Sequence, residues 1–159
     1  MVINYICAMK IEDLHKIKFK SEQQKAIVNV RITSNTIGAR QNAFVSEFGL
    51  SMAQFNVLRI LRGAKTQLSI HVVKERMIEV SPNTTRLIDK LIDKELVSRI
   101  RCEEDKRIVF VEITKKGLEL LSQIDIKLEK ETFFSTQLTD EEAVQLNFLL
   151  DKLRNEWSK

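Results

Sequence analysis

The sequence predicts a mainly helical α+β fold in which one β-hairpin interrupts a series of helices. Only four of the 159 residues are glycine and one is proline, the two residues that most strongly disfavour helix interiors. Apolar residues recur at roughly helical intervals along most of the chain. Two short runs, residues 97–102 and 108–113, instead have the composition of strands. The length suits one domain, or one domain with helical extensions.

A long helix is predicted over residues 21–48. Its apolar positions, spaced at roughly helical intervals, are Ala26, Ile27, Val30, Ile37, Phe44 and Phe48. Gly49 then ends the helix, because glycine readily adopts the left-handed conformation found just past a helix end. Residues 1–20 form an N-terminal extension and lead-in. Met9, followed by Lys10, would make an ordinary start, so residues 1–8 are interpreted as an upstream extension.

Two shorter helices are predicted next. Ser51 and Gln54 have the spacing of a capping box, in which a hydroxyl and an amide side chain satisfy free amides at a helix start. The helix that they open ends near Gly63. A second, shorter helix over residues 69–77 packs through apolar residues. These are Ile70, Val73 and Met77.

The pair Ser81-Pro82 predicts the start of the following helix. Serine caps free amides, and proline is tolerated at the first helical position because its missing N–H would have no partner there. This helix runs to about Glu95. Its core face consists of Leu87, Ile88, Leu91 and Ile92.

A hairpin and two further helices complete the prediction. The two strands, residues 97–102 and 108–113, flank a fully charged segment over residues 103–107, which suits a solvated tip. Thr114 caps the next helix, and Thr139 with Glu142 forms a second capping box for the last one. The compact core therefore spans residues 51–114. The long helices of residues 21–48 and 115–157 flank it.

Two short helices followed by a longer helix and a hairpin describe a winged helix-turn-helix, the core of this mainly α fold. In that motif the longer helix enters the DNA major groove with its N-terminal residues leading. The candidate DNA-binding residues there are Ser81, Asn83, Thr84, Thr85 and Arg86. Asn and Arg can pair bidentately with bases, and Thr offers a hydroxyl and a methyl group. Capping alone explains Ser81, but it explains the two consecutive β-branched threonines poorly.

The charged hairpin tip is the second candidate DNA contact. Arg107 is placed to enter a narrow minor groove, and Lys106 to contact phosphate. Asp105 would be repelled by DNA, so its predicted role is to brace Arg107 or Arg101 through a charge-assisted hydrogen bond. Taken alone, the tip is better interpreted as a soluble turn.

These segments together resemble the MarR family of bacterial regulators. The resemblance covers about residues 21–157, and it rests on the order and spacing of several weak motifs. These are residues 81–94, Leu96-Val97-Ser98-Arg99, Asp105-Lys106-Arg107 and Ile113-Thr114-Lys115-Lys116-Gly117. Two residues depart from the family pattern: Glu95 replaces a usual glycine, and Ile113 replaces a usual leucine. With glutamate at position 95, we expect the turn to lack a left-handed residue.

The resemblance implies a ligand-responsive transcriptional repressor that acts as a homodimer. The flanking helices would interleave between two subunits, and the operator would be a pseudo-palindrome with half-sites about one helical turn apart. A small aromatic or phenolic effector, or an oxidant, would change the spacing of the two DNA-reading helices. Such an effector would lie between the DNA-binding core and the dimerisation helices.

The composition of the chain limits the classes of protein to which it can belong. A net charge of +4 permits a polyanionic partner without requiring one. A zinc site is not expected, because the chain has only two cysteines, Cys7 and Cys102, and its two histidines, His15 and His71, lie far apart in sequence. No cofactor is expected. No apolar run approaches the roughly 20 residues that span a bilayer. His71 has no sequence-adjacent carboxylate or cysteine for nucleophilic chemistry, so no enzyme activity is expected, and a reducing cytoplasm is the expected location.

Two other functions stay open at the level of sequence. A winged helix can serve protein contacts alone, in which case no DNA fragment would bind in a salt-dependent way. A redox-sensing regulator needs a reactive thiol. Cys7 has no basic neighbour nearer than Lys10, and Cys102, beside Arg101 at a strand end, is typical of a half-buried residue.

Overall fold

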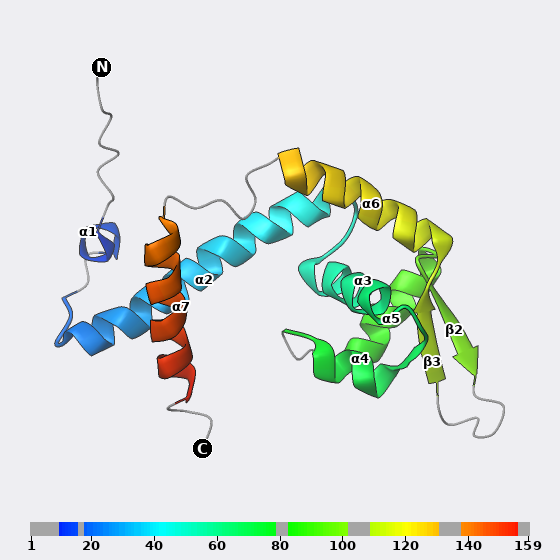
Figure 1. The fold of residues 1–159 in the computed structure, drawn as a ribbon, viewed down its shortest axis with the longest axis horizontal. Coiled ribbons are helices and arrows are strands. Elements are labelled where there is room, and N and C mark those ends of the chain that lie inside the picture. Colours follow the sequence, from blue (N-terminus) through cyan, green and yellow to red (C-terminus); the bar gives the residue numbers. More distant parts are fainter. Residues whose placement is uncertain (1–9, 16–17, 79–82, 102–108, 131–137, 156–159) are drawn as a thin grey trace. The chain divides into compact units, whose positions relative to one another are not determined.

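The computed structural model describes residues 10–15, 18–78, 83–101, 109–130 and 138–155. The predicted fold class is confirmed, since helices dominate and the strands form one small sheet (Figure 1). The elements in order are α1 (Ile11–His15), α2 (Glu22–Ser46), α3 (Met52–Ala64), β1 (Leu68–Ser69), α4 (Ile70–Arg76), α5 (Thr84–Asp93), β2 (Val97–Arg101), β3 (Val109–Ile113), α6 (Lys115–Lys130) and α7 (Asp140–Asn155). The chain divides into two compact units, residues 1–121 and 122–159.

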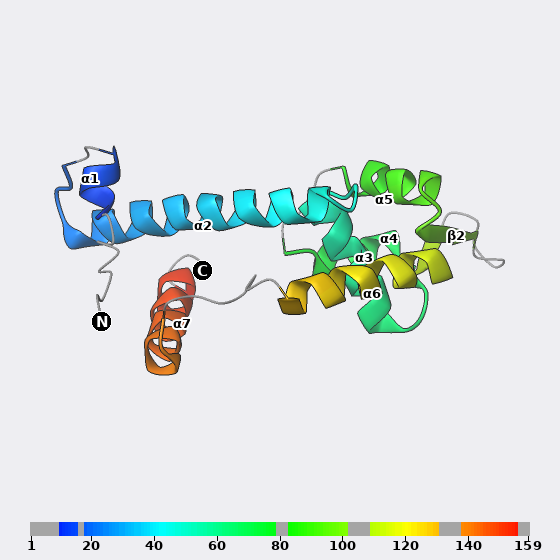
Figure 2. The ribbon, with the colours of Figure 1, turned by 90° about the horizontal axis from the view of Figure 1, so that it is seen from above.

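Helix α2 is one unbroken helix, as predicted (Figure 2). It starts after Ser21, whose hydroxyl accepts a hydrogen bond from the Gln24 amide at 3.2 Å. Past its end, Gly49 takes the predicted left-handed conformation with φ of +69°. Phe44 and Val45 are the buried residues of this helix. Helix α2 is therefore anchored in the core of the first unit by its C-terminal end.

Helix α3 begins with the predicted capping box. The Ser51 hydroxyl accepts from the Gln54 amide at 3.2 Å, and the Gln54 side chain accepts from the Ser51 amide at 3.0 Å. Two elements were not predicted: helix α1, which lies within the lead-in of residues 1–20, and strand β1, at Leu68 and Ser69, which pairs antiparallel with β3. Two residues are too few to show a strand period, and Ser69 also caps α4 by accepting from the Val72 amide at 3.3 Å.

Helix α5, which we call the recognition helix, starts later than predicted. Asn83 takes the N-cap position and its carbonyl accepts the first helical hydrogen bond, from the Leu87 amide at 3.0 Å. The prediction that Ser81 caps this helix and Pro82 opens it is therefore wrong, and both residues lie outside the described ones. The reason is that Ser81 and Asn83 both favour N-caps, so residue type alone does not choose between them.

The hairpin matches the prediction where it is described. The three strands lie in the order β1-β3-β2, all antiparallel, and Val97 pairs with Ile113 at one end of the hairpin. At the other end Arg101 pairs with Val109. The predicted strand-end residues Cys102 and Ile108 lie outside the described residues. We call this hairpin the wing.

Helices α3, α4 and α5 pack together beside the sheet, and their apolar faces form the core of the first unit (Figure 1). In the first unit, side chains with at most 1% exposure come from α2, α3, α4, α5, α6, β2 and β3. They include Leu58, Leu61, Ile88, Leu91 and Val111. Fully burying one such side chain contributes about 1.5–3 kcal/mol. Ile88 and Leu91 thereby fix one face of the recognition helix and leave the opposite face to solvent.

The last two helices start at the predicted caps. The Thr114 hydroxyl accepts from the Gly117 amide at 3.1 Å at the start of α6. In the second unit, the Glu142 amide donates to the Thr139 hydroxyl at 3.3 Å, and the Glu142 carboxylate accepts from the Thr139 amide at 2.9 Å. This reciprocal pair is the predicted second capping box.

Candidate nucleic-acid interface

The start of the recognition helix presents polar side chains to solvent. Asn83 at the N-cap and Thr85 and Arg86 in the first turn are exposed. The amides of a first helical turn point along the helix axis and favour negative groups such as phosphate. This end of α5 therefore offers both an anion site and side chains that can hydrogen-bond to base edges.

Thr84, in contrast, lies in the protein interior. Its side chain is 3% exposed, and its hydroxyl donates to the Met77 sulfur at 3.9 Å. A buried side chain cannot reach a base edge, so the expectation that Thr84 contacts DNA is corrected. The helical period explains the difference, because Thr84 lies one turn before Ile88 on the core face.

An ion pair joins the recognition helix to the wing. The Arg99 guanidinium, on β2, donates to the Asp89 carboxylate on the polar face of α5. Both side chains are partly exposed, at 39% and 47%. The pair bridges two elements whose relative orientation decides whether helix and wing can contact the same duplex. The sequence motif of residues 96–99 contains Arg99, but no local pattern indicates that Asp89 is its partner.

The end of the recognition helix is closed by a Schellman motif. The Leu96 amide donates to the Leu91 carbonyl at 2.9 Å, and the Glu95 amide donates to the Ile92 carbonyl at 2.7 Å. Glu95 has φ of +62°, so the expectation that this turn lacks a left-handed residue is wrong. The helix must reverse direction into β2, and Glu95 adopts the conformation that glycine would take more readily.

Contacts from the start of α6 hold this turn in place. The Thr114 hydroxyl donates to the Glu95 carbonyl at 2.8 Å, and the Lys116 ammonium lies 2.6 Å from the Glu95 carboxylate. The hydrogen bond from Lys116 holds the pKa of the Glu95 carboxyl below its usual range. Gly117 lies against the Leu96 carbonyl, where a Cβ would approach to 2.4 Å. These contacts define the end of α5 relative to α6.

A second tether links the recognition helix to the end of α2. The Lys94 ammonium, at the C-cap of α5, donates to the Gly49 carbonyl just past α2. A cation at this position also suits the negative end of the helix dipole. The sequence carried no clear signal for this contact, because it joins residues 45 positions apart.

A cavity of about 260 Å³ lies between the end of α2, the start of α3 and the end of α4. Gly38 and Asn42 line it from α2, Phe55 and Arg59 from α3, and Met77 from the end of α4. Met77 also accepts the hydrogen bond from Thr84. One residue therefore contacts both this cavity and the first turn of the recognition helix.

Several predicted site residues lie outside the described ones. These are Ser81, Asp105, Lys106, Arg107, Cys7 and Cys102. The backbone of Arg101 ends strand β2, but its side chain is also outside the description. The wing contacts, their bracing and the redox alternative therefore stay predictions.

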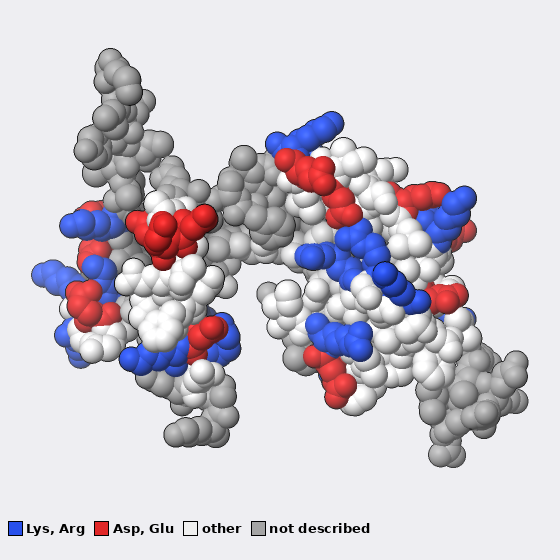
Figure 3. All heavy atoms as spheres, in the orientation of Figure 1, with Lys and Arg blue, Asp and Glu red and all other residues white. Residues whose placement is uncertain are grey.

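Basic and acidic side chains are interleaved on the face of the molecule drawn in Figure 3. A surface of mixed sign steers a polyanion only modestly, so contact geometry carries more of any DNA recognition. Among the residues that the structure describes, no helix is both long and apolar enough to cross a membrane.

A recognition helix with an exposed polar start, preceded by helices α3 and α4 and followed by a wing, defines a winged helix-turn-helix protein. The family model of the transcriptional regulator SarA/Rot matches residues 41–124, more than half of the chain. The uncharacterised HTH-type transcriptional regulator YpoP of Bacillus subtilis is 36% identical over 109 residues, which cover 65% of this chain and 74% of YpoP. The chain belongs to the MarR family of winged helix-turn-helix transcriptional regulators.

Two further similarities agree with this family. The HTH-type transcriptional regulator MhqR of Bacillus subtilis is 32% identical over 89 residues; the match covers 56% of this chain and 61% of the length of MhqR. A crystal structure of a mutant MarR from E. coli, complexed with operator DNA, superimposes with a TM-score of 0.68. That match covers 86% of this chain and 99% of the MarR chain, and at 24% identity it shows a shared fold.

Proposed function

We propose that this chain is a transcriptional repressor that binds a pseudo-palindromic DNA operator as a homodimer and is released by a small effector. One observation carries the DNA-binding part: the exposed, polar first turn of α5 stands on a helix whose opposite face is buried in the core. A rigidly held helix with hydrogen-bonding side chains at its N-terminus is what major-groove reading requires.

The roles in this proposal follow from position. Asn83, Thr85 and Arg86 read bases, with Ser81 near them on the phosphate backbone. In the wing, Arg107 enters the minor groove and Lys106 contacts phosphate. Asp105 and Arg101 brace the wing tip. The family membership and the operator complex of a protein with the same fold support this arrangement.

The homodimer is supported by apolar surface on α7. In the described part of this helix no residue is buried, and large apolar side chains face solvent. Val144, Phe148 and Leu149 are 69%, 66% and 51% exposed. Apolar side chains at helical spacing that α7 leaves uncovered within its own unit are suited to burial by a second copy. Two copies would set the spacing of two recognition helices, and hence of two half-sites.

The effector site in this proposal is the cavity between α2, α3 and α4. It combines apolar walls, such as Phe55, with polar groups, such as Asn42 and Arg59, which suits a small aromatic or phenolic molecule. A ligand that displaces Met77 would disturb the contact between Met77 and Thr84 at the start of α5. Release follows only if the ligand prefers the DNA-incompetent conformation; a 100-fold preference gives about 2.7 kcal/mol of coupling.

The DNA-binding test begins by selecting duplexes from a random library with the full chain. Fluorescence anisotropy then measures affinity for the selected duplex and for random DNA across a series of salt concentrations. Arg107→Ala should weaken binding to both duplexes and reduce the salt slope. Asn83→Ala should relax preference at one base position, and equal losses on both duplexes would remove its reading role. Absence of salt-dependent binding to every duplex would overturn the proposal in favour of a protein-binding module.

Four further measurements address the oligomeric state, the effector site, repression against activation, and thiol sensing. Sedimentation should give a dimer for the wild type, and Phe148→Glu should shift it toward monomer. Ala53→Leu, which partly fills the α2–α3–α4 cavity, should retain DNA affinity but lose release by phenolic compounds. In vitro transcription from the selected site should fall when the protein is added; a rise would identify an activator. Loss of DNA binding on peroxide treatment would favour the thiol-sensing alternative.

A further inference from the structure

Met77 is a buried methionine that directly follows helix α4. It takes the C-cap position of α4, and it is only 5% exposed. Its sulfur accepts a hydrogen bond, at 3.9 Å, from the hydroxyl of Thr84 in the first turn of α5. The lone pair of a thioether sulfur reacts with electrophilic oxidants. Met77 therefore places an oxidisable atom against the start of the recognition helix.

The cavity between α2, α3 and α4 gives Met77 a route to solvent. Met77 lines this cavity together with exposed residues, among them Asn42, Ser51 and Ile78. A cavity of about 260 Å³ is large enough for an oxidant that is only slightly larger than a water molecule. Met77 is thus packed among other side chains and still borders a space that small molecules can enter.

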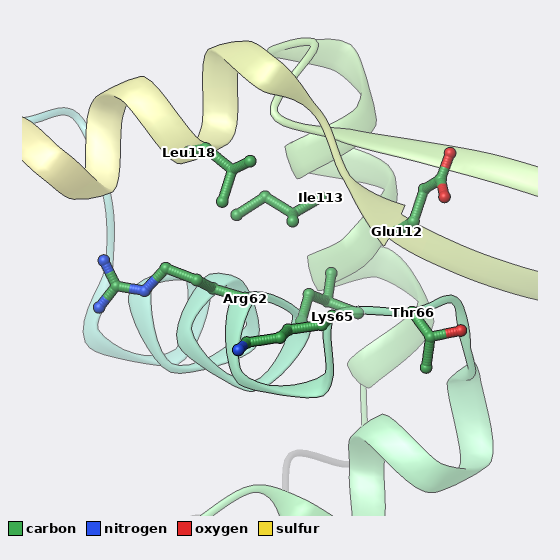
Figure 4. Close-up of a pocket in the computed structure, with 7 residues that line it drawn as sticks. Arg62, Lys65, Thr66, Glu112, Ile113 and Leu118 are labelled. Carbon is green, nitrogen blue, oxygen red and sulfur yellow. The ribbon is translucent and has the colours of Figure 1, made fainter.

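Two other features of the chain provide matched comparisons. Met52, the first residue of α3, lines the same cavity, and its amide donates to the Asn42 side chain of α2 at 3.2 Å. A second cavity, of about 330 Å³, lies at the base of the wing (Figure 4). We call it the wing-base cavity, and none of the seven residues described as lining it contains sulfur. Met52 therefore separates Met77 from methionine in general, and the wing-base cavity separates one cavity from another.

We propose that Met77 is a modification site at which a hypohalous acid such as hypochlorous acid forms methionine sulfoxide. The sulfoxide is a structural switch at the start of the recognition helix. Oxidation converts a flexible apolar side chain into a polar one, which disturbs a packed interior. This site differs from the thiol alternative, because it uses neither Cys7 nor Cys102.

The chemical step balances with hypochlorous acid and water. The sulfur lone pair attacks the chlorine atom, the Cl–O bond breaks, and hydroxide leaves. Water then adds to the sulfur and chloride leaves, with the release of two protons, one of which neutralises the hydroxide. The sulfur has lost two electrons, chlorine has gained them as chloride, and the oxygen of the sulfoxide comes from water.

The sulfoxide changes the contact between Met77 and Thr84 in both volume and polarity. An added oxygen atom in a close-packed interior displaces its neighbours. The oxygen is also a much stronger acceptor than the thioether sulfur beside the Thr84 hydroxyl. The first turn of α5, which carries the residues proposed to read bases, would shift to accommodate it. The effect on DNA rests on the proposed function, whereas the oxidation and the shift do not.

The modification is tested by adding hypochlorous acid in small steps to the full chain. Peptide mass spectrometry measures the oxidation of each methionine, and we expect Met77 to gain one oxygen atom while circular dichroism still shows a folded chain. Ala53→Leu, which partly fills the α2–α3–α4 cavity, should slow this oxidation about threefold or more, because side-chain oxidation follows exposure. Thr66→Leu, at the wing-base cavity, is the matched control and should leave the rate unchanged.

Hydrogen exchange measures the structural consequence. The Leu87 amide, which donates to the Asn83 carbonyl, should exchange faster in the oxidised wild type than in the untreated one. Met77→Leu, a substitution that packed cores tolerate, should remove this change, and Met52→Leu should retain it. Fluorescence anisotropy should show that oxidation lowers DNA affinity about tenfold in the wild type and in Met52→Leu, but not in Met77→Leu.

The outcomes separate the site from its consequences. A Met77 that stays unmodified while Met52 is fully oxidised overturns the site, and equal rates in Ala53→Leu and Thr66→Leu overturn the route through the cavity. Oxidation of Met77 with unchanged exchange at Leu87 overturns the structural switch.

The DNA response has its own outcomes. A loss of DNA affinity that persists in Met77→Leu overturns the link to DNA, whereas a loss that persists in the double variant Cys7→Ser, Cys102→Ser supports it. A chain that shows the exchange change but binds no duplex overturns the proposed function and leaves the modification site intact.

Discussion

The Arg99 guanidinium donates to the Asp89 carboxylate, so that a wing strand is tied directly to the polar face of the recognition helix. This pair joins two elements that would both contact DNA, although neither residue was singled out as a DNA contact. Partly exposed ion pairs contribute little to stability, at most about 1 kcal/mol. Such a pair can still fix the orientation of one element relative to another, because the planar guanidinium sets the direction of its hydrogen bonds as well as their length.

Breaking this ion pair should lower the affinity for DNA clearly, while the free energy of unfolding should change only slightly. We expect Asp89→Asn to lower DNA affinity about three- to tenfold while the free energy of unfolding falls by less than about 1 kcal/mol. Anisotropy and urea denaturation measure the two quantities. The exchanged pair Asp89→Arg with Arg99→Asp should recover part of the affinity. A variant that loses stability and affinity in proportion would show that the pair only supports folding.

Thr84 and Thr85 form a matched pair for separating packing from base reading. Thr84→Val keeps the buried shape and removes the hydroxyl that donates weakly to the Met77 sulfur, so DNA affinity should stay within about twofold. Thr85→Val changes an exposed side chain of the same size and should weaken discrimination at one base pair by about 1–3 kcal/mol. Competition anisotropy with single-base operator variants measures both. The reverse order of effects would contradict the burial-based assignment.

Replacing Gly117 or Gly38 by alanine should change the free energy of unfolding in opposite directions. A Cβ on Gly117 would lie 2.4 Å from the Leu96 carbonyl oxygen and 2.7 Å from a side-chain carbon of Ile113. Gly117→Ala should therefore destabilise by about 1–3 kcal/mol. Gly38 lies inside α2, and a Cβ added there would meet nothing within 4 Å, so Gly38→Ala should stabilise by up to about 1 kcal/mol. Urea denaturation of both variants provides the comparison, and equal shifts would argue against the crowded junction.

The Glu95–Lys116 ion pair should give a small pH dependence to stability. Because the folded pKa of Glu95 lies below its unfolded value, the pair stabilises fully above the unfolded pKa and is lost as pH falls through the folded one. The thermal midpoint of Glu95→Gln should lie below that of the wild type near pH 7, and the difference should shrink toward about pH 3. The effect is small, since the Glu95 side chain is 79% exposed. In a Lys116→Gln background the pH-dependent difference should disappear.

The sequence predicted the helices most reliably where a cap and an apolar period agreed. Ser51 with Gln54, and Thr139 with Glu142, form capping boxes as their spacing indicated. Capping is local, because the groups involved lie within three residues of each other. Where two capping residues lie close together, as Ser81 and Asn83 do, the local pattern is ambiguous, and the predicted start of α5 is too early.

The sequence predicted the candidate site as a segment. The burial of each side chain in the structure then shows which of its residues face solvent. Thr84 and Thr85 are chemically identical, so residue type does not say which one faces the core, although the helical period places Thr84 one turn before Ile88. Packing of Ile88 and Leu91 against the rest of the unit sets the rotation of the helix, and that rotation buries Thr84. Strand β1 was missed for a related reason, because its two residues become a strand only through pairing with β3.

By itself the sequence determined the order of the elements, their caps and the family motifs, because these depend on groups close together in the chain. Only the tertiary structure decided how the recognition helix is held. Lys94 contacts Gly49, and Arg99 contacts Asp89, across distances in sequence that no local pattern records. The structure also decided the conformation of Glu95, since a left-handed glutamate persists only where hydrogen bonds on both sides fix the turn. Such contacts form when the elements pack, and they place the residues that we propose to read DNA.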